Sequence, residues 1–206
     1  MPTELEAVAA EAAGCTRCRL HQSRTQVVFG QGDPHADLMV VGEAPGFHED
    51  RQGLPFVGPS GQLLNRLLEG IGLRRQEVYI CNVVKSRPPG NRDPLPDEIA
   101  ACRPWLDAQV RLVDPRVVVT LGNFAAKTLL ETTTGITRLR GRTYPFQGRV
   151  LLPTFHPAAA LHAQGRHTAG PSPLEAMEDD FRVLAELLAA QAPAEEGRPS
   201  EQLGLF

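Results

Sequence analysis

No stretch of this 206-residue chain is long and apolar enough to span a membrane, because a transmembrane helix needs about 20 consecutive apolar residues. The first residues also lack the basic region and apolar core of a secretory signal peptide, and carry Glu4, Glu6 and Glu11 instead. We therefore expect a cytoplasmic protein with no membrane association.

Basic residues are also fewer than acidic ones. The 21 lysines and arginines are outnumbered by 24 aspartates and glutamates, which gives a formal net charge of −3. This balance does not by itself indicate a nucleic-acid partner. Residues 85–92 nevertheless hold three basic residues and no acidic one, so a local basic face that binds DNA is compatible with the sequence.

Cysteine is scarce, with four residues in the chain: Cys15, Cys18, Cys81 and Cys102. In a chain expected to stay in the reducing cytoplasm, they indicate a metal site before disulfides. Cys15 and Cys18 have the spacing of a ligand pair. Cys81 lies in a predicted strand, where a lone cysteine is most often a small buried apolar residue.

Apolar patterning predicts strands that alternate with helices. Continuous apolar runs, typical of strands covered on both faces, occupy residues 37–42, 78–84 and 116–121. Helical spacing or helix-start signals predict helices over residues 5–13, 61–71, 96–113, 123–130 and 174–190. A hairpin is expected over residues 143–155. This alternation implies a three-layer α/β/α sandwich with a central, mainly parallel sheet.

Three chemically versatile residues lie at predicted strand ends. Glu43 follows the first strand in residues 42–46 (GEAPG), Asn82 lies in the second, and His156 follows the last, where Pro157 ends the strand. The carboxyl ends of parallel strands meet at one edge of the sheet, so we expect one site there. Taken singly, each residue also has a structural interpretation: a turn carboxylate, a loop-tethering amide or a packed histidine.

A nucleobase is a ligand that suits this set. The amide of Asn82 offers a donor and an acceptor, which complement the edge of uracil. Phe56 lies in the Gly- and Pro-rich residues 53–58 (GLPFVG), which would fix its ring as a platform for stacking on a base.

In their order along the chain, these motifs resemble the family 4 uracil-DNA glycosylases, the iron–sulfur glycosylases of bacteria and archaea. The resemblance runs from Cys15 to His156 and is carried by residues 42–46 (GEAPG), 49–50 (ED), 53–58 (GLPFVG), 61–64 (GQLL), 79–85 (YICNVVK), 87–89 (RPP) and 156–158 (HPA). It implies a central four-stranded parallel sheet and an enzyme that removes uracil from DNA in base excision repair.

The resemblance also implies a role for each residue. Glu43, after Gly42 in the first motif, matches the carboxylate that positions or activates water, and His156 matches the histidine that donates to the departing base. Phe56 and Asn82 match the stacking ring and the amide that reads the Watson–Crick edge. The motifs contain no identifiable lysine nucleophile, so we expect a monofunctional hydrolase that leaves an abasic site.

The metal ligands depart from the family's pattern. A 4Fe–4S cluster held by four cysteines is implied, and Cys15, Cys18 and Cys102 match three of the positions, but Ser86 stands at the remaining one. Three alternatives are open: Ser86 supplies an alkoxide or leaves one iron open, Cys81 replaces it, or the cluster is labile or absent. Zinc is the second choice of metal.

A second departure is Phe47, which stands where family members often have an acidic residue. We expect Phe47 to contact the substrate. The bulk of its side chain is compatible with exclusion of the thymine methyl group. Arg87 and Arg92 are candidate DNA contacts. Leu161 is a candidate wedge into the duplex and Arg166 a candidate phosphate contact.

Residues 191–206 are rich in Ala, Pro, Glu and Gly, so we expect a disordered tail after a single domain over residues 1–190. The tail ends in a segment that resembles the pentapeptide by which bacterial repair and replication proteins bind the β sliding clamp: Gln202, Leu203, Gly204, Leu205 and Phe206. An unremarkable C-terminal end is the alternative. We expect a monomer that binds uracil-containing DNA, single- or double-stranded, and the clamp.

Two other functions compete with this interpretation. A relative that becomes covalently trapped on its abasic product carries an extra histidine in a basic insertion, whereas residues 86–92 (SRPPGNR) contain none. A catalytically silent iron–sulfur or zinc protein that binds DNA as a repair scaffold would not need Glu43, Asn82 and His156 together.

Overall fold

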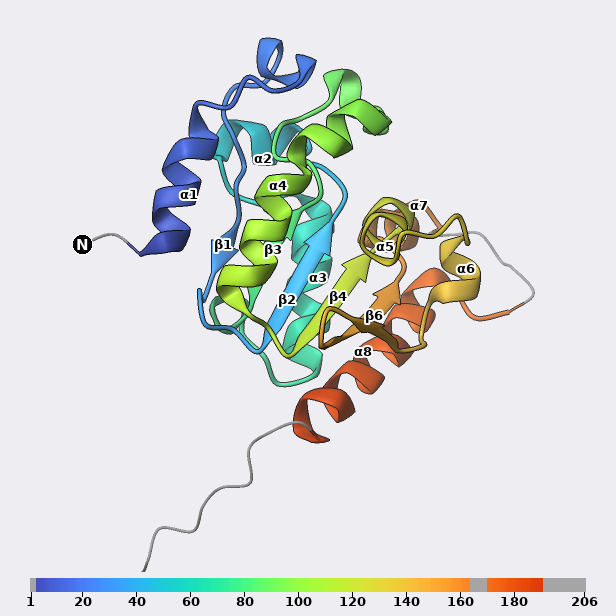
Figure 1. Ribbon diagram of the computed structural model, residues 1–206. Helices are drawn as coiled ribbons and strands as arrows, with labels where there is room; N and C mark the ends of the chain where they lie inside the picture. The colour runs from blue at the N-terminus through green and yellow to red at the C-terminus, as the bar shows by residue number, and fades with distance from the viewer. Residues whose placement is uncertain (1–2, 164–169, 191–206) are drawn as a thin grey trace, which may run out of the picture.

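The computed structural model describes residues 3–163 and 170–190, which form a three-layer α/β/α sandwich (Figure 1). Its strands are β1 (Gln31–Gly32), β2 (Leu38–Gly42), β3 (Tyr79–Asn82), β4 (Val117–Leu121), β5 (Tyr144–Phe146) and β6 (Arg149–Thr154). Its α-helices are α1 (Glu4–Ala13), α2 (Phe47–Gln52), α3 (Pro59–Gly70), α4 (Pro96–Val113), α5 (Asn123–Leu130), α6 (Ile136–Leu139), α7 (Pro157–His162) and α8 (Pro173–Ala190).

One six-stranded sheet forms the middle layer, in the order β1-β3-β2-β4-β6-β5. The central strands β3, β2, β4 and β6 pair in parallel. The short outer strands β1 and β5 run antiparallel to β3 and β6. The expected α/β/α sandwich with a mainly parallel sheet is therefore confirmed, including the hairpin of β5 and β6.

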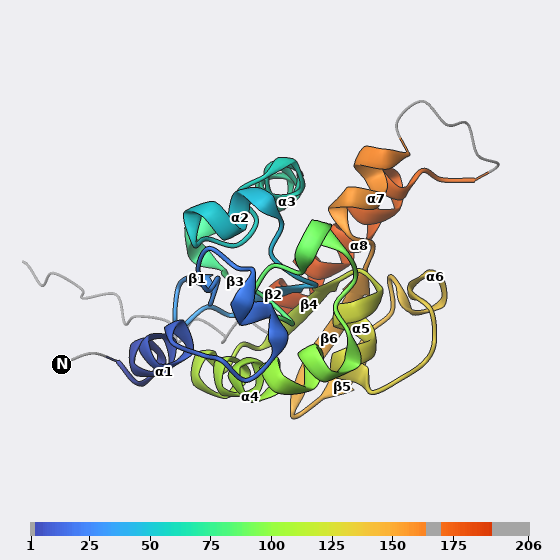
Figure 2. The ribbon, with the colours of Figure 1, turned by 90° about the horizontal axis from the view of Figure 1, so that it is seen from above.

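Helices cover both faces of the sheet, and the alternation of side chains along each strand divides the core in two. Met39 and Val41 of β2 pack in the cluster that includes α1, α4 and α5, whereas Leu38 and Val40 pack in the cluster of α3, α7 and α8. Figure 2, a view from above, shows these two groups of helices on opposite sides of the strands. Burial on both faces explains why the strands read as continuous apolar runs.

The predicted helices agree with α1, α3, α4, α5 and α8 to within two residues at each end. Three short helices, α2, α6 and α7, were not predicted, because four to six residues are too few to show a helical period. Two of them follow the motif loops directly: α2 starts after residues 42–46, and α7 starts with Pro157, whose fixed φ suits a first helical turn.

Within residues 3–163 and 170–190, the structure contains no helix that is long and apolar enough to cross a membrane. The predicted tail of residues 191–206, with its C-terminal pentapeptide, lies outside the described residues, as does Arg166.

Candidate active site

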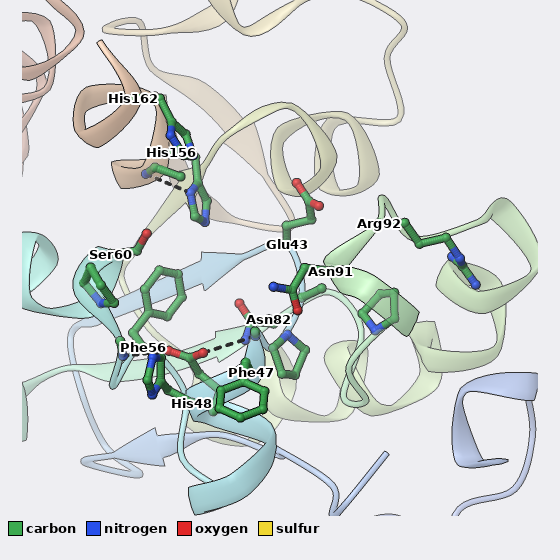
Figure 3. A pocket seen from close by; sticks show the side chains of 18 residues that line it. Glu43, Phe47, His48, Phe56, Ser60, Asn82, Asn91, Arg92, His156 and His162 are labelled. Carbon is green, nitrogen blue, oxygen red and sulfur yellow. Dashed lines mark hydrogen bonds between the residues drawn. The ribbon is translucent and has the colours of Figure 1, made fainter. Parts of the chain in front are cut away.

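The ends of β2, β3 and β6 open into one pocket of about 500 Å³ (Figure 3). Five of the predicted substrate and catalytic residues line it: Glu43, Phe47, Phe56, Asn82 and His156. Gly42, also predicted to bind the substrate, is not among the lining residues, and its role in binding stays a prediction. The parallel sheet therefore brings together segments that are up to 113 positions apart, from Glu43 to His156.

Gly42 lies beneath the pocket and allows its floor to close. A Cβ atom at this position would lie 2.4 Å from both Asn82 Oδ1 and Phe56 Cζ, closer than real Cβ contacts come. The missing side chain thus lets the amide of Asn82 and the ring of Phe56 pack against the end of β2. Any larger residue would displace one of the two.

Asn82 is 1% exposed, and its Oδ1 atom has no hydrogen-bond partner among the described residues. A buried acceptor without a partner costs about 1–3 kcal/mol, so such atoms are rare in folded proteins. The strand around it is well held, since Val83 N donates to the carbonyl of Gly42 at 2.9 Å. Asn82 therefore presents a rigidly placed, unsatisfied acceptor to the pocket.

Phe56 is held in a strained conformation, with φ at 51° in the left-handed region. For a bulky residue this costs on the order of 1–3 kcal/mol and persists only if neighbouring groups enforce it. The carboxylate of Glu49 does so from one side, because its Oε1 accepts hydrogen bonds from Val57 N at 2.9 Å and Gly58 N at 2.8 Å.

Arg75 holds the same loop from the other side. Its guanidinium donates to the carbonyl oxygen of Phe56 at 3.1 Å and to that of Pro55. Gly61 completes the enclosure, since a Cβ there would lie 1.8 Å from the Phe56 carbonyl oxygen. The role of Arg75 was not predicted, because nothing in its local pattern distinguishes it from a surface arginine.

His156 is half-buried at the start of α7, and its Nδ1 accepts a hydrogen bond from Ala158 N at 3.2 Å. Burial lowers the pKa of His156 to about 4, although the carboxylate of Glu49 opposes the shift. The imidazole is therefore neutral at pH 7. Because Nδ1 accepts, the proton lies on Nε2, which leaves that nitrogen as a donor.

Glu43 has the opposite shift. Burial, and to a lesser degree the charge of Asp93, raises the pKa of Glu43 to about 7. Its carboxyl group is thus close to half ionised at neutral pH, as suits a general base. The site combines a poised carboxylate, a neutral imidazole donor, a stacking ring and an unsatisfied amide.

Phe47, which was predicted to contact the substrate, lines the pocket, and Arg87, a candidate DNA contact, lies beside its ring. Phe47 is 45% exposed, and the guanidinium carbons of Arg51 and Arg87 lie 5.4 Å and 5.1 Å from the centre of its ring. An exposed ring between two cations suits contact with DNA. Exclusion of the thymine methyl group by Phe47 stays a prediction.

The other candidate DNA contacts are more constrained. Both terminal nitrogens of Arg92 donate to the fully buried carboxylate of Glu98, at 2.9 Å and 2.6 Å, which ties the loop of residues 86–92 to α4. Leu161 belongs to α7 and is half-buried against the core. A role for either in binding DNA stays a prediction.

Three of the four cysteines lie in one corner. Cys15 and Cys18 pack on the core cluster that contains both Cys102 of α4 and Cys81 of β3. Burial raises the pKa of the Cys102 thiol, and the neighbouring Cys18 and Cys15 raise it further. Ser86 is adjacent, because Lys85 N donates to Cys102 Sγ at 3.4 Å. Among the described residues, no three His, Cys, Asp or Glu side chains are grouped to hold one metal ion.

Comparison with known proteins agrees with this geometry. Residues 29–182 match the model of the uracil DNA glycosylase superfamily. The chain is 43% identical over 192 residues to a type-4 uracil-DNA glycosylase of Sulfurisphaera tokodaii, covering 89% of this chain and 84% of that protein. It is 41% identical over 198 residues to a type-4 uracil-DNA glycosylase of Archaeoglobus fulgidus, covering 92% and 96%. A type-5 uracil-DNA glycosylase of Thermus thermophilus is 34% identical over 165 residues, covering 68% and 73%.

The fold, the pocket at the strand ends and these matches define a member of the uracil-DNA glycosylase superfamily. Within it, the chain belongs to the type-4 uracil-DNA glycosylases.

The raised pKa of Glu43 can be tested by the pH dependence of the rate and by that of the melting temperature. As pH rises through about 7, wild-type kcat/KM should increase because the carboxylate ionises, and Glu43→Gln should abolish this dependence.

The folded-state pKa of Glu43 lies above the ordinary value of 4.5, so ionisation of Glu43 destabilises the fold increasingly as pH rises from about 4.5 to about 7. Glu43→Gln should therefore raise Tm more at pH 8 than at pH 5. An equal change in Tm at both pH values would contradict the raised pKa of Glu43.

Proposed function

We propose that this type-4 uracil-DNA glycosylase reads a flipped uracil through Asn82 and hydrolyses its N-glycosidic bond with Glu43 and His156. The observation that carries the proposal is the unpaired Oδ1 of Asn82. Uracil carries an N–H group at N3 beside the O4 acceptor, so it satisfies both halves of the amide. Cytosine presents an acceptor at N3, which would face Oδ1 unfavourably.

The other pocket residues support the chemistry of bond cleavage. Phe56 offers a fixed face for stacking on the extruded base. The Nε2–H of His156 is suited to donate to the uracil O2 as negative charge develops there, and a neutral donor avoids the cost of burying a cation. Ionised Glu43 would orient water and stabilise the positive charge on the sugar.

The positions of the lysines argue against an amine nucleophile. The chain has two lysines, Lys85 and Lys127, and neither lines the pocket. An amine nucleophile is therefore absent from the described pocket lining, which supports a monofunctional enzyme that leaves an abasic site.

We expect Glu43→Gln, Asn82→Ala and His156→Ala each to slow release of uracil from a uracil-containing duplex by on the order of 100-fold. Binding of uracil-free DNA and Tm near pH 5 should change little. Single-turnover cleavage, with the products resolved, checks this and separates the alternatives. Free uracil with an abasic site supports the proposal, whereas a covalent adduct or binding without cleavage would refute it.

We propose further that Cys15, Cys18 and Cys102 hold an iron–sulfur cluster beside Ser86. Each iron of a 4Fe–4S cluster takes its own thiolate, so the ligands stand further apart than around a single ion. The thiols of Cys15, Cys18 and Cys102 lie near one another and are the ligand type that an iron–sulfur cluster takes, and zinc is the second choice. The cluster would supply a structural cross-link between the N-terminal segment and the loop after β3.

Ser86 is favoured over Cys81 as the fourth residue. Ser86 Oγ accepts from Arg24 at 3.3 Å, and Arg24 also lowers the pKa of Cys18, so Ser86 lies on the side of the paired cysteines. The thiol of Cys81 instead lies beside the ammonium of Lys85. Cys102 also contacts Lys85, so this contact does not exclude Cys81, which stays the alternative fourth ligand.

Protein purified without oxygen should be brown and contain about four irons per chain, or about three if Ser86 leaves one corner empty. Ser86→Cys should slow loss of iron in air, because a fourth thiolate protects the open corner. Cys81→Ser is the matched control and should leave the iron content unchanged, whereas Cys102→Ser should abolish it. Stoichiometric zinc without iron or sulfide would refute the cluster and leave the catalytic proposal intact.

We propose the β sliding clamp as a partner of the C-terminal pentapeptide, on the basis of the sequence alone. Leu203, Leu205 and Phe206 would fill an apolar pocket while Gln202 forms hydrogen bonds at its rim. The cost of ordering a short segment limits such binding to modest affinity, which suits transient recruitment. The expected cytoplasmic location and monomeric state likewise stay predictions.

Deletion of residues 202–206 should abolish binding to purified β clamp and leave uracil release from short duplexes unchanged. A variant with Gln202, Leu203 and Phe206 replaced by Ala keeps the length of the tail and should behave in the same way. Equal binding by wild-type and truncated proteins, measured by surface plasmon resonance, would remove the clamp from the partners.

A further inference from the structure

A buried lysine lies behind the strand that carries Asn82. Lys85 is 2% exposed, and its side chain turns back toward the end of β3. Its ammonium donates to the backbone carbonyl oxygen of Asn82 at 2.6 Å and to Oε1 of Gln109 on α4. The ring of Phe29 lies 5.9 Å from the same ammonium. The catalytic chemistry proposed above makes no use of this group.

The partners of the ammonium are themselves fixed. Nε2 of Gln109 donates to the carbonyl oxygen of Phe29 at 2.8 Å and to Tyr79 Oη at 3.0 Å, so Oε1 must face Lys85. Gly30 leaves room for this network, because a Cβ there would lie 2.7 Å from Tyr79 Oη. Lys85 is thus held from α4 and from the segment before β1.

The network lies on the opposite face of the sheet from the pocket. Tyr79 and Cys81 belong to the core cluster of α4, whereas Ile80 belongs to that of α3 and α8, and Asn82 has the same parity as Ile80. Lys85 therefore reaches only the backbone of Asn82, while the Asn82 side chain points to the pocket.

Stability alone is a poor explanation for a lysine here. Lys85 is almost completely buried, and a charged side chain is costly to remove from water. A well-packed apolar residue of similar volume commonly stabilises a core at least as well as a buried charge. An apolar residue could donate neither to the Asn82 carbonyl nor to Gln109, and of these two hydrogen bonds only the first one reaches a pocket residue.

We propose that Lys85 is a positioning residue that fixes the peptide plane of Asn82 and thereby the direction in which its amide meets the base. This deepens the proposed function and rests on the role of Asn82 in it. Oδ1 of Asn82 has no hydrogen-bond partner in the part of the chain that the structure describes, so no such bond fixes the amide before the base arrives. Displacement of a recognition group by about 1 Å costs up to about 100-fold in rate, so a backbone anchor matters.

A double-mutant cycle tests the proposal. Lys85→Met keeps the volume of the side chain and removes the donor, and it should slow single-turnover release of uracil about tenfold, a usual coupling between contacting residues. In the Asn82→Ala background the same substitution should change the rate less than about twofold, because there is no amide left to position. Affinity for uracil-free DNA should not change, since Lys85 is buried.

Leu106→Ala is the matched control, because Leu106 is fully buried in the same cluster and is remote from the pocket lining. It should lower Tm without an effect that depends on Asn82. If Lys85→Met does not fold, Gln109→Met releases the ammonium from α4 and enters the same cycle.

The outcomes separate the proposal from its premise. An equal slowing by Lys85→Met in both backgrounds would overturn the positioning role and leave Asn82 as the reader of the base. A wild-type rate for Asn82→Ala would overturn both. A normal rate for Lys85→Met with lowered Tm would show that the lysine is structural only.

Discussion

The parallel pairing of β2 with β3 is the constraint on which the active site depends. The register places Gly42 opposite Asn82, so the loop that carries Glu43 leaves the sheet beside the amide of Asn82. The ladder continues past the strand ends, since Val84 N donates to the carbonyl oxygen of Glu43 at 3.1 Å. A slip by one residue would turn Asn82 to the other face and place a Cβ where the floor has room for none.

The site holds its functional groups in states that folding alone would not favour. Glu43 resists ionisation, Asn82 keeps an unsatisfied acceptor, and Phe56 adopts a left-handed backbone. Contacts outside the pocket offset these costs. Glu49 and Arg75 hold the Phe56 loop from two sides, so the ring is in place before the base arrives. Preorganisation of this kind places the cost of arranging the site in folding rather than in the reaction.

The segment of residues 82–86 connects the pocket with the corner that contains the cysteines. Residues 82–86 contain Asn82 at the pocket, Lys85 behind the sheet and Ser86 beside the cysteines. The backbone of Lys85 contacts Cys102, and its side chain contacts Asn82. The cysteine corner therefore braces the strand end that carries the amide, which gives the proposed cluster a structural reason to be near a hydrolytic site.

The layers of the fold and the position of the pocket could be predicted from the sequence, because both depend on local sequence patterns. Apolar runs and helical spacing identified the layers, and strand ends followed by Glu43, Asn82 and His156 indicated one pocket, since parallel strands share an edge. Tertiary structure alone decided which partners hold these groups. Arg75 donates to the carbonyl oxygen of Pro55, 20 positions away, and Lys85 donates to Gln109, 24 positions away. At such separations, the spacing of residues along the sequence does not indicate which side chains will meet. The pKa values of Glu43 and His156 likewise arise from burial, which depends on the whole fold around them.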